Sequence, residues 1–329
     1  MDIFKSLYQQ VFSVTPEGFE SLALQLFQFQ YVHNPIYKAY VDHLTVNPSK
    51  VTELTSIPFL PIEFFKGHRV ATGSWKEERI FESSGTTGMA TSRHFVFDSS
   101  YYLQNCRQAF EMEYGSLSEY TILALLPSYL EREGSSLIFM AEDFIKKSGD
   151  SRSGFFLHNT GELVETLTQL RKEGRKILLL GVTFGLLDLA EAFQLDLEGV
   201  IVMETGGMKG RRKEMLRTEV HEVLTRSFGV DRIHSEYGMT ELFSQAYSKG
   251  WGIFKPAGSM HVFTRDINDP LTVSNELRSG GLNIIDLANI HSCCFIETKD
   301  IGKVHENGTF EVLGRMDNSD IRGCNLMLA

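Results

Sequence analysis

Two short apolar runs in the middle of the chain constrain the fold most strongly. Residues 177–180 and 199–203 have the length of buried strands and carry no charge. Residues 213–228 then have the polar and apolar spacing of an amphipathic helix. Buried strands that alternate with helices are typical of a sheet covered by helices, so we predict an α/β fold from about Glu77 onwards. Further short strands are predicted over residues 79–82, 94–97, 120–126, 261–263, 282–285 and 310–313.

The first 75 residues have a different pattern, which predicts helices. Apolar residues recur at helical spacing over residues 4–12. Thr15 followed by Pro16 is a typical cap and first-turn pair for a second helix. We expect residues 1–75 to form a helical segment that packs on a core comprising residues 76–329.

Charge and hydropathy exclude several classes of protein. The chain has 32 Lys and Arg against 42 Asp and Glu, so its net charge is −10. A general nucleic-acid binder or a binder of anionic membranes needs a basic surface, and this composition has no overall basic excess to supply one. The longest uncharged apolar stretch, residues 177–187, is too short to span a membrane. The N-terminus lacks the pattern of a secretory signal and the four cysteines form no CxxC pair, so we expect a cytoplasmic protein with reduced thiols.

A loop rich in glycine and hydroxyl side chains lies between two predicted strands. Such a loop can turn its backbone N–H groups and hydroxyls inward to hold a polyphosphate. It is not a Walker A loop, because no Lys-Ser or Lys-Thr pair follows at the required spacing. The alternative is a plain hairpin turn. The residues of this candidate phosphate loop are Ser83, Ser84, Gly85, Thr86, Thr87 and Gly88.

A second segment of the chain combines an aromatic ring with oxygen side chains. Tyr237 could stack on a flat base, while Thr240 and Glu241 could reach a phosphate and its Mg²⁺, a cation that prefers oxygen ligands. The alternative is a strand-to-helix turn with Thr240 as the helix cap. The residues of this candidate nucleotide motif are Tyr237, Gly238, Met239, Thr240 and Glu241, with Glu241 as the metal ligand.

A third pair of residues lies towards the C-terminus. Asp300 follows Thr298-Lys299, and Arg315 follows Gly314. One carboxylate and one guanidinium could bind the hydroxyls of a ribose. Taken singly, each residue could equally be a loop aspartate or a surface arginine.

The order and spacing of these three segments resemble the adenylate-forming superfamily, which contains acyl-CoA synthetases, peptide-synthetase adenylation domains and luciferases. The resemblance implies that the chain is the large N-terminal domain of that fold and that it uses ATP and Mg²⁺. It also implies that the first segment holds phosphates, that Tyr237 binds adenine, and that Asp300 and Arg315 bind ribose. Members of the superfamily usually continue past the Gly-Arg-x-Asp hinge into a small mobile domain. This chain ends at Ala329, so we expect that small domain to be absent.

Three other segments resemble a narrower group, the LuxE-like acyl-protein synthetases of the bacterial fatty-acid reductase complex, relatives of phenylacetate-CoA ligases. They are residues 57–66, 206–210 and 322–325. The resemblance implies that a fatty acid is activated as an acyl-adenylate, transferred to a cysteine near the C-terminus and delivered to a reductase subunit. Cys324, in a hinge and tail from about residue 314 to 329, has the position of that cysteine. Its thiolate would be favoured by Arg322; the alternative is a buried, unreactive cysteine.

The chain departs from the superfamily pattern where cations are expected. Relatives carry Pro-Lys after the phosphate loop, whereas this chain has Ala90 and Thr91, which leaves Arg93 as the candidate cation. The catalytic lysine of the superfamily belongs to the small C-terminal domain. Another cation must then offset the charge that develops on the α-phosphate. Lys209 and the basic run 211–213 are our candidates. The alternatives are an ordinary turn residue for Lys209 and a solvated helix start for the run.

Paired glycines precede this lysine. Gly206 and Gly207 are expected to line the pocket for the carboxylic acid.

Two other functions remain open at this point. The chain could transfer the acyl group to CoA or to a separate carrier, with Cys324 uninvolved, or it could be a non-catalytic nucleotide-binding subunit.

Overall fold

The chain forms two compact units. The computed structural model describes residues 3–83, 91–126, 134–157, 159–206, 215–274 and 279–316. The first unit comprises Met1–Ser74 and Gly258–Ala329, and the second comprises Trp75–Ala257. The segment that the sequence predicted to be helical therefore belongs to the same unit as the C-terminal strands.

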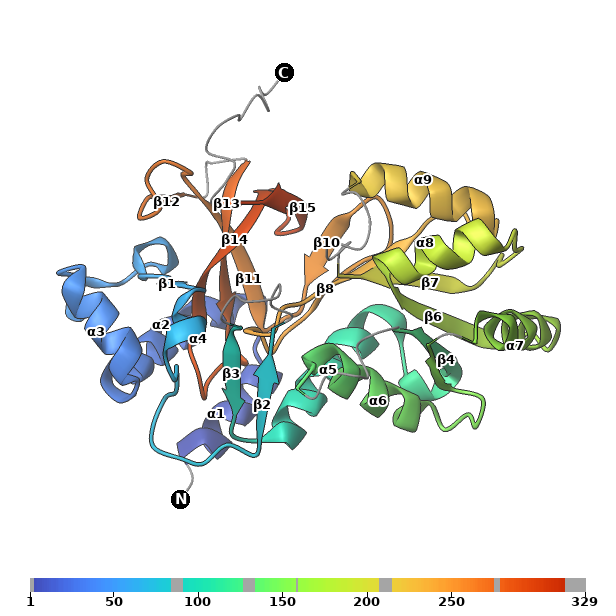
Figure 1. Ribbon diagram of the computed structural model, residues 1–329. Helices are drawn as coiled ribbons and strands as arrows, with labels where there is room; N and C mark the ends of the chain where they lie inside the picture. The colour runs from blue at the N-terminus through green and yellow to red at the C-terminus, as the bar shows by residue number, and fades with distance from the viewer. Residues whose placement is uncertain are drawn as a thin grey trace. The chain divides into compact units, whose positions relative to one another are not determined.

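Two of the helices at the start of the first unit begin where a capping residue and a proline place them (Figure 1). The hydroxyl of Thr15 accepts a hydrogen bond from the amide of Gly18, and the side chain of Asn34 accepts from the amide of Tyr37. A proline at the first helical position follows each cap, because its fixed φ suits the helix and its missing N–H costs nothing there. The helices of this unit are α1 (Ile3–Phe12), α2 (Pro16–His33), α3 (Pro35–His43) and α4 (Phe64–Gly67), with 3-10 turns η1 (Pro48–Lys50) and η2 (Leu54–Ser56).

The sheet of the first unit is antiparallel except for one short strand. Its strands are ordered β12-β11-β13-β14-β15, and β1 pairs in parallel with β14. Aromatic rings from the helices and the sheet meet in its core, where Tyr37 stacks on Phe295 with 5.9 Å between ring centroids. The strands are β1 (Leu60–Pro61), β11 (Met260–Arg265), β12 (Val273–Ser274), β13 (Ser279–Asp286), β14 (Phe295–Val304) and β15 (Phe310–Arg315).

A buried polar side chain joins α2 to the loop before β14. The amide of Gln30 donates to the carbonyls of Asn289 and Ile290 and accepts from the amide of Cys294. Cys293 and Cys294 of this loop are buried, and strand β14 begins at Phe295.

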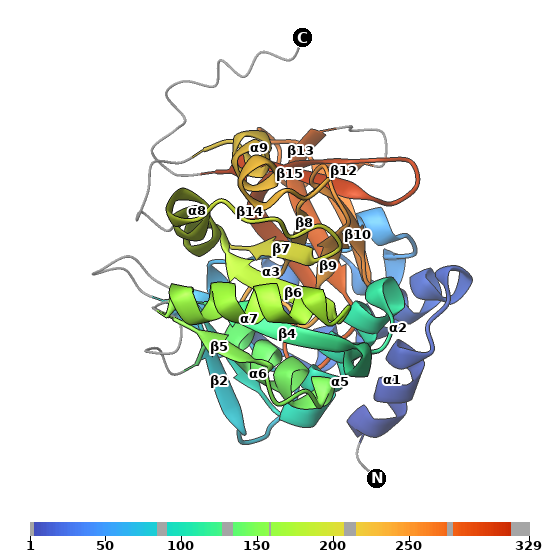
Figure 2. The same cartoon turned by 90° about the vertical axis from the view of Figure 1, so that its right-hand side faces the viewer.

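The second unit has a mainly parallel sheet with helices on both faces. Its strands are ordered β5-β4-β6-β7-β8-β9-β10; the first four pairings are parallel and the last two antiparallel. In Figures 1 and 2, α5 and α6 cover one face and α8 and α9 the other. The strands are β4 (Tyr120–Leu125), β5 (Gly154–Phe156), β6 (Lys176–Val182), β7 (Ile201–Thr205), β8 (His234–Tyr237), β9 (Ala246–Ser248) and β10 (Ile253–Pro256). The helices are α5 (Ser99–Tyr114), α6 (Ser136–Ser148), α7 (Thr160–Lys172), α8 (Thr183–Ala192) and α9 (Arg217–Phe228), with the 3-10 turn η3 (Leu117–Glu119).

The predicted α/β fold is confirmed, with two local corrections. The uncharged stretch 177–187 contains more than the strand predicted over 177–180: helix α8 follows β6, and Gly181 leaves room at the junction for Leu186, whose Cγ would lie 2.6 Å from a Cβ there. The helix predicted over 213–228 begins, within the described residues, at Arg217.

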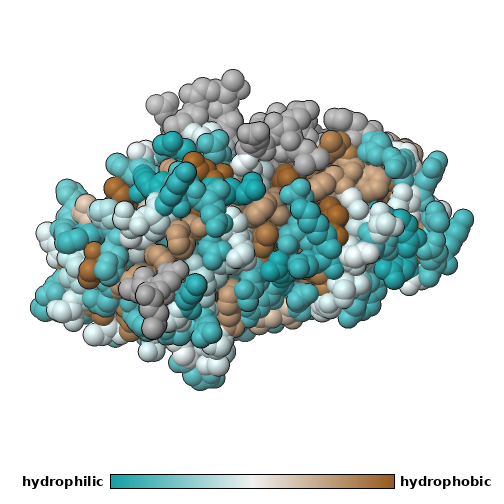
Figure 3. All heavy atoms as spheres, turned by 90° about the horizontal axis from the view of Figure 1, so that it is seen from below, coloured by the Kyte–Doolittle hydropathy of each residue, from teal (hydrophilic) through white to brown (hydrophobic). Residues whose placement is uncertain are grey.

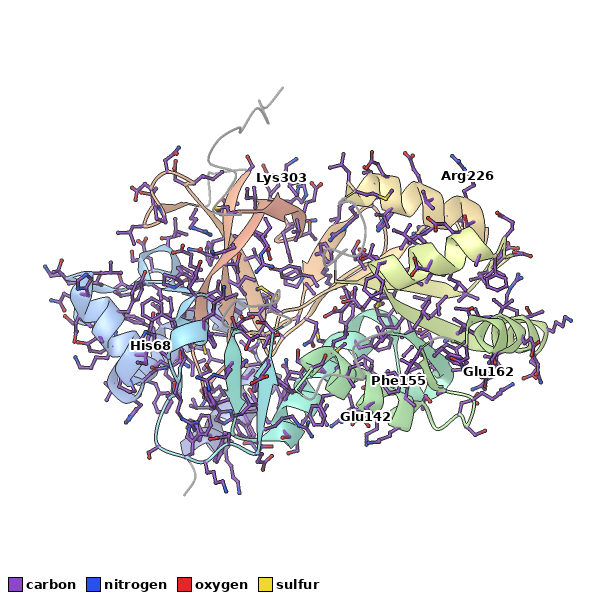
Figure 4. The ribbon with its side chains drawn as sticks, viewed as in Figure 1. His68, Glu142, Phe155, Glu162, Arg226 and Lys303 are labelled. Atoms are coloured by element: carbon purple, nitrogen blue, oxygen red, sulfur yellow. The ribbon has the colours of Figure 1, made fainter. Side chains whose placement is uncertain are left out.

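On the face seen in Figure 3, hydrophobic residues are scattered among hydrophilic ones. Glu142, Glu162 and Arg226 extend outward from α6, α7 and α9 in Figure 4. Among the residues that the structure describes, no helix has the length and hydropathy needed to cross a membrane.

Candidate active site

A two-stranded hairpin of the second unit carries the candidate phosphate loop. Strands β2 (Arg79–Glu82) and β3 (Arg93–Val96) pair antiparallel, with Glu82 opposite Arg93. Ser83 closes the hairpin: its amide donates to the carbonyl of Ser92 at 3.0 Å, and its hydroxyl accepts from the amide of Ser92 at 2.9 Å. A closed hairpin fits both the phosphate-loop and the plain-turn interpretation. The other candidates of this loop, Ser84, Gly85, Thr86, Thr87 and Gly88, lie outside the described residues.

Arg93 is the first residue of β3 after the loop. Its side chain is exposed, and its guanidinium carbon lies 5.8 Å from the ring centroid of Phe95. The cation is therefore available at the end of the hairpin nearest the loop.

The candidate nucleotide motif follows β8. Tyr237 is the last residue of the strand, and its ring centroid lies 5.8 Å from that of Phe254. Gly238 is exposed. The carbonyl of Met239 accepts a hydrogen bond from the amide of Leu242, which closes a turn. The next element is strand β9, so the alternative of a strand-to-helix turn with Thr240 as a cap is wrong. Parallel pairing ends here, and the chain reverses direction instead of crossing over.

A buried histidine joins this turn to the hairpin. His94 of β3 is fully buried, and its Nδ1 lies 2.8 Å from the carbonyl oxygen of Thr240. Its ring packs on Phe243 at 4.8 Å between centroids. The hairpin that carries the candidate phosphate loop is thus in contact with the candidate nucleotide motif, through two residues that lie 146 positions apart. Sequence reasoning placed His94 only in the strand predicted over residues 94–97. His94 lies opposite Phe81 in the hairpin, and no local sequence pattern signals its contact with Thr240.

A buried carboxyl group supports the motif from one face of the sheet. Glu236 accepts a hydrogen bond from the hydroxyl of Thr205 on β7. Burial raises the pKa of Glu236 to about 7; the hydroxyl of Thr205 opposes this shift and the charge of Glu204 adds to it. A Cβ at position 238 would lie 2.5 Å from Oε1 of Glu236, which explains the glycine beside Tyr237.

A second buried carboxyl group lies on the opposite face, below α8 and α9. Thr183 donates to Oε2 of Glu204 at 2.9 Å and lies 3.2 Å from the carbonyl oxygen of Gly206. Arg217 and His221 of α9 approach Oε1 of Glu204 at 3.4 and 3.6 Å. Burial disfavours the charged form, but the contacts with His221 and Arg217 outweigh it and lower the pKa of Glu204.

These contacts position Gly206 at the carboxyl end of β7, where side chains and loops of parallel sheets commonly form ligand sites. Gly207 and Lys209, the other candidates of this segment, lie outside the described residues.

The candidate ribose pair lies in the first unit. Asp300 on β14 is directly opposite Arg315 on β15, and the amide of Met316 donates to the carbonyl of Lys299 at 2.7 Å. Asp300 is half-buried and Arg315 is exposed. The register therefore brings the two predicted ribose ligands together. Cys324 lies outside the described residues.

The carboxylate of Glu241 suits a Mg²⁺ site in which the protein supplies a single ligand. Within the described parts of the chain, no group of three His, Cys, Asp or Glu side chains could hold a metal. Glu241 is a buried carboxylate directly after Thr240. Mg²⁺ is commonly held by one or two carboxylates together with phosphate oxygens and water, so a single glutamate fits such a site.

Comparison with solved structures supports the fold. ATP-bound MatB from Rhodopseudomonas palustris is 15% identical over 74% of this chain and 49% of its own, with a TM-score of 0.54. A 2-hydroxyisobutyryl-CoA ligase in complex with 2-HIB-AMP and CoA is 12% identical over 94% of this chain and 71% of its own, with a TM-score of 0.60. No protein-family model matches the sequence, and no curated protein matches it significantly. The chain spans about half the length of MatB, and the likeness confirms the predicted fold of the adenylate-forming enzymes.

Proposed function

We propose that the chain activates a carboxylic acid with ATP to form an acyl-adenylate. The observation that carries this proposal is the fold likeness, over 94% of the chain, to a 2-hydroxyisobutyryl-CoA ligase solved in complex with 2-HIB-AMP and CoA. The contact of His94 with Thr240 supports it, because it joins the hairpin that carries the candidate phosphate loop to the candidate nucleotide motif. The register of Asp300 and Arg315 supports it further.

In the reaction, a carboxylate oxygen attacks the α-phosphorus of ATP. The bond from that phosphorus to the bridging oxygen of pyrophosphate breaks, and pyrophosphate leaves with the electron pair. Residues 83–88 hold the pyrophosphate end, Tyr237 stacks on adenine, and Asp300 with Arg315 binds the ribose hydroxyls. Arg93 and Lys209 offset charge on the phosphates, and Gly206 with Gly207 lines the acid pocket. Bound Mg²⁺, held through Glu241, would supply further neutralisation of phosphate charge.

The acceptor in our proposal is Cys324. Its thiolate attacks the acyl carbonyl, the bond from that carbon to the AMP oxygen breaks, and AMP leaves, so that a thioester on the protein remains. The acid is a fatty acid in this proposal, and the thioester is delivered to a reductase, as the LuxE-like resemblance implies. The second candidate is transfer to free CoA, which the CoA-bound ligase among the similar structures favours.

The test begins with ATP–pyrophosphate exchange over a panel of carboxylic acids. Exchange with at least one fatty acid is expected; exchange with none contradicts adenylation and favours a non-catalytic nucleotide-binding subunit. Intact mass after incubation with ATP and that acid then locates the acyl group. A hydroxylamine-labile adduct is expected on the wild type and on Cys106→Ala, which removes a buried thiol of α5, and none on Cys324→Ser. Exchange without any adduct, together with acyl-CoA formation, would select the CoA ligase instead.

A further inference from the structure

The strand that carries Asp300 is irregular at that residue. Between two regular pairings, Leu282 of β13 alone faces residues 298–300 of β14. Bulges of this kind bend a strand and redirect a side chain, and they are frequent beside active sites. Asp300 is the last of the three bulged residues. The flanking pairings are Gly281↔Ile301 and Asn283↔Glu297.

One buried arginine supplies the hydrogen bonds that the irregular ladder lacks. Arg265, at the end of β11, is 3% exposed. Its Nη1 donates to the carbonyl of Leu282 and to Oδ1 of Asn283, each at 3.1 Å, and its Nη2 donates to the carbonyl of Thr298 at 2.7 Å. The planar fork of a guanidinium suits several fixed acceptors at once, which a lysine cannot reproduce.

Thr298 extends this set of bonds to Asp300. The hydroxyl of Thr298 donates to the carbonyl of Leu282 at 2.7 Å and accepts from the amide of Asp300 at 3.1 Å. Arg265 and Thr298 thus share the Leu282 carbonyl, and Thr298 connects it to the backbone of Asp300. These four residues define what we call the bulge network.

Two glycines make room for the arginine. A Cβ at Gly281 would lie 2.4 Å from the guanidinium carbon of Arg265, and a Cβ at Gly280 would lie 2.1 Å from the Arg265 carbonyl oxygen. The guanidinium therefore packs directly over the backbone of β13. Its acidic neighbour, Glu297, approaches Nη2 only to 3.6 Å. A buried cation is weak evidence for stability, because its desolvation offsets its contacts, so its placement here calls for another reason.

We propose that Arg265 is a positioning residue, which fixes the bulge so that the Asp300 carboxylate meets the ribose hydroxyls of the nucleotide. The inference rests on the proposed function, because it requires that Asp300 bind ribose. It predicts that weakening the bulge network removes the preference for ribose hydroxyls rather than nucleotide binding as a whole.

The experiment compares the Kd of ATP with that of 2′,3′-dideoxy-ATP by calorimetry. For the wild type we expect the dideoxy nucleotide to bind at least roughly 10-fold more weakly, the effect of losing a hydrogen bond to a charged group. In Arg265→Lys and in Thr298→Val, which is nearly isosteric, that ratio should fall below about 3-fold. Tyr37→Phe is the matched control: it removes a buried hydrogen bond to Pro58 in the same unit, none from the bulge network, and should keep the wild-type ratio.

The outcomes separate the two proposals. A wild type that binds neither nucleotide contradicts the proposed function, and with it this inference. If the wild type binds ATP more tightly than the dideoxy nucleotide, and Arg265→Lys and Thr298→Val show the same Kd ratio, the positioning role alone is overturned. If Arg265→Lys does not fold, Thr298→Val decides the question. An equal loss of ratio in Tyr37→Phe would assign the effect to general loosening of the unit and would also overturn the role.

Discussion

The two candidate regions differ in how deeply their acidic side chains are buried. In the second unit, Glu204 and Glu236 come from the ends of parallel strands with helices on both faces of the sheet, and both are buried. In the first unit, Asp300 and Glu297 lie on an antiparallel strand and are only half-buried. Burial makes each uncompensated charge expensive, so the second unit should be sensitive to pH and to loss of a partner. In the first unit, the positions of the charges depend more on backbone geometry.

The largest effect on stability is expected from removing the cation beside Glu204. Arg217→Met keeps an apolar stem near Phe254 but leaves a carboxylate whose side chain is 4% exposed without its arginine. Breaking a buried pair in this way costs roughly 3–5 kcal/mol, and we expect the free energy of unfolding, measured in urea, to fall by that order. Arg226→Met on the exposed side of the same helix is the control and should stay within about 0.5 kcal/mol of the wild type. Equal losses in the two variants would contradict a special role for burial.

The next effect concerns Glu236 and has the opposite sign. Burial raises the pKa of this carboxyl from 4.5 to about 7, so between these pH values the folded state binds more protons than the unfolded state. The stability contribution is present below about pH 4.5 and is lost as the pH rises through 7.

Glu236→Gln should therefore raise the free energy of unfolding relative to the wild type, and this gain should be about 3 kcal/mol larger at pH 8 than at pH 4.5. The measurement is urea unfolding of both proteins at several pH values from 4.5 to 8. Glu162→Gln, exposed on α7, should follow the wild type at every pH. Parallel pH curves for the wild type and Glu236→Gln would show that the carboxyl is already ionised in the folded state.

The sequence predicted strand positions well because burial on both faces leaves uninterrupted apolar runs. Strands β4 and β6 lie where residues 120–126 and 177–180 indicated, and α2 begins at the predicted Pro16. The hairpin that carries residues 83–88 was also indicated by its composition. These are local properties, in which each residue's own chemistry limits what the backbone does.

The parts that sequence reasoning missed depend on residues far apart in the chain. Arg265 has the sequence context of an exposed strand end, and its burial follows only from Gly281 and Thr298 on two other strands. The contact of His94 with Thr240 likewise joins segments with no shared pattern. The roles of Asp300 and Arg315 came from resemblance; their register agrees with that resemblance, and ribose binding remains a prediction.

A smaller effect is expected where the hairpin meets the nucleotide motif. His94→Phe keeps a ring against Phe243 but leaves the carbonyl of Thr240 without the imidazole. Loss of one partner of a buried hydrogen bond costs about 1–2 kcal/mol, so unfolding in urea should show a decrease of that size. Amide exchange over residues 238–242 should accelerate by more than exchange in β4, which serves as the internal control. Unchanged exchange in the turn would mean that His94 does not hold it.

The smallest expected effect tests the comparison between the two units most directly, because it removes the cation of an ion pair in the first unit, as Arg217→Met does in the second. Lys299→Met removes a cation that lies 2.6 Å from Glu63, but the Glu63 side chain is 43% exposed, against 4% for Glu204. Water solvates the carboxylate left behind, so we expect a loss of no more than about 0.5 kcal/mol in urea unfolding. Raising the salt concentration should reduce this loss further while leaving that of Arg217→Met nearly unchanged, since screening acts mainly on exposed pairs. If Lys299→Met proves as costly as Arg217→Met, burial is not what separates the two regions, and strand geometry would have to account for both.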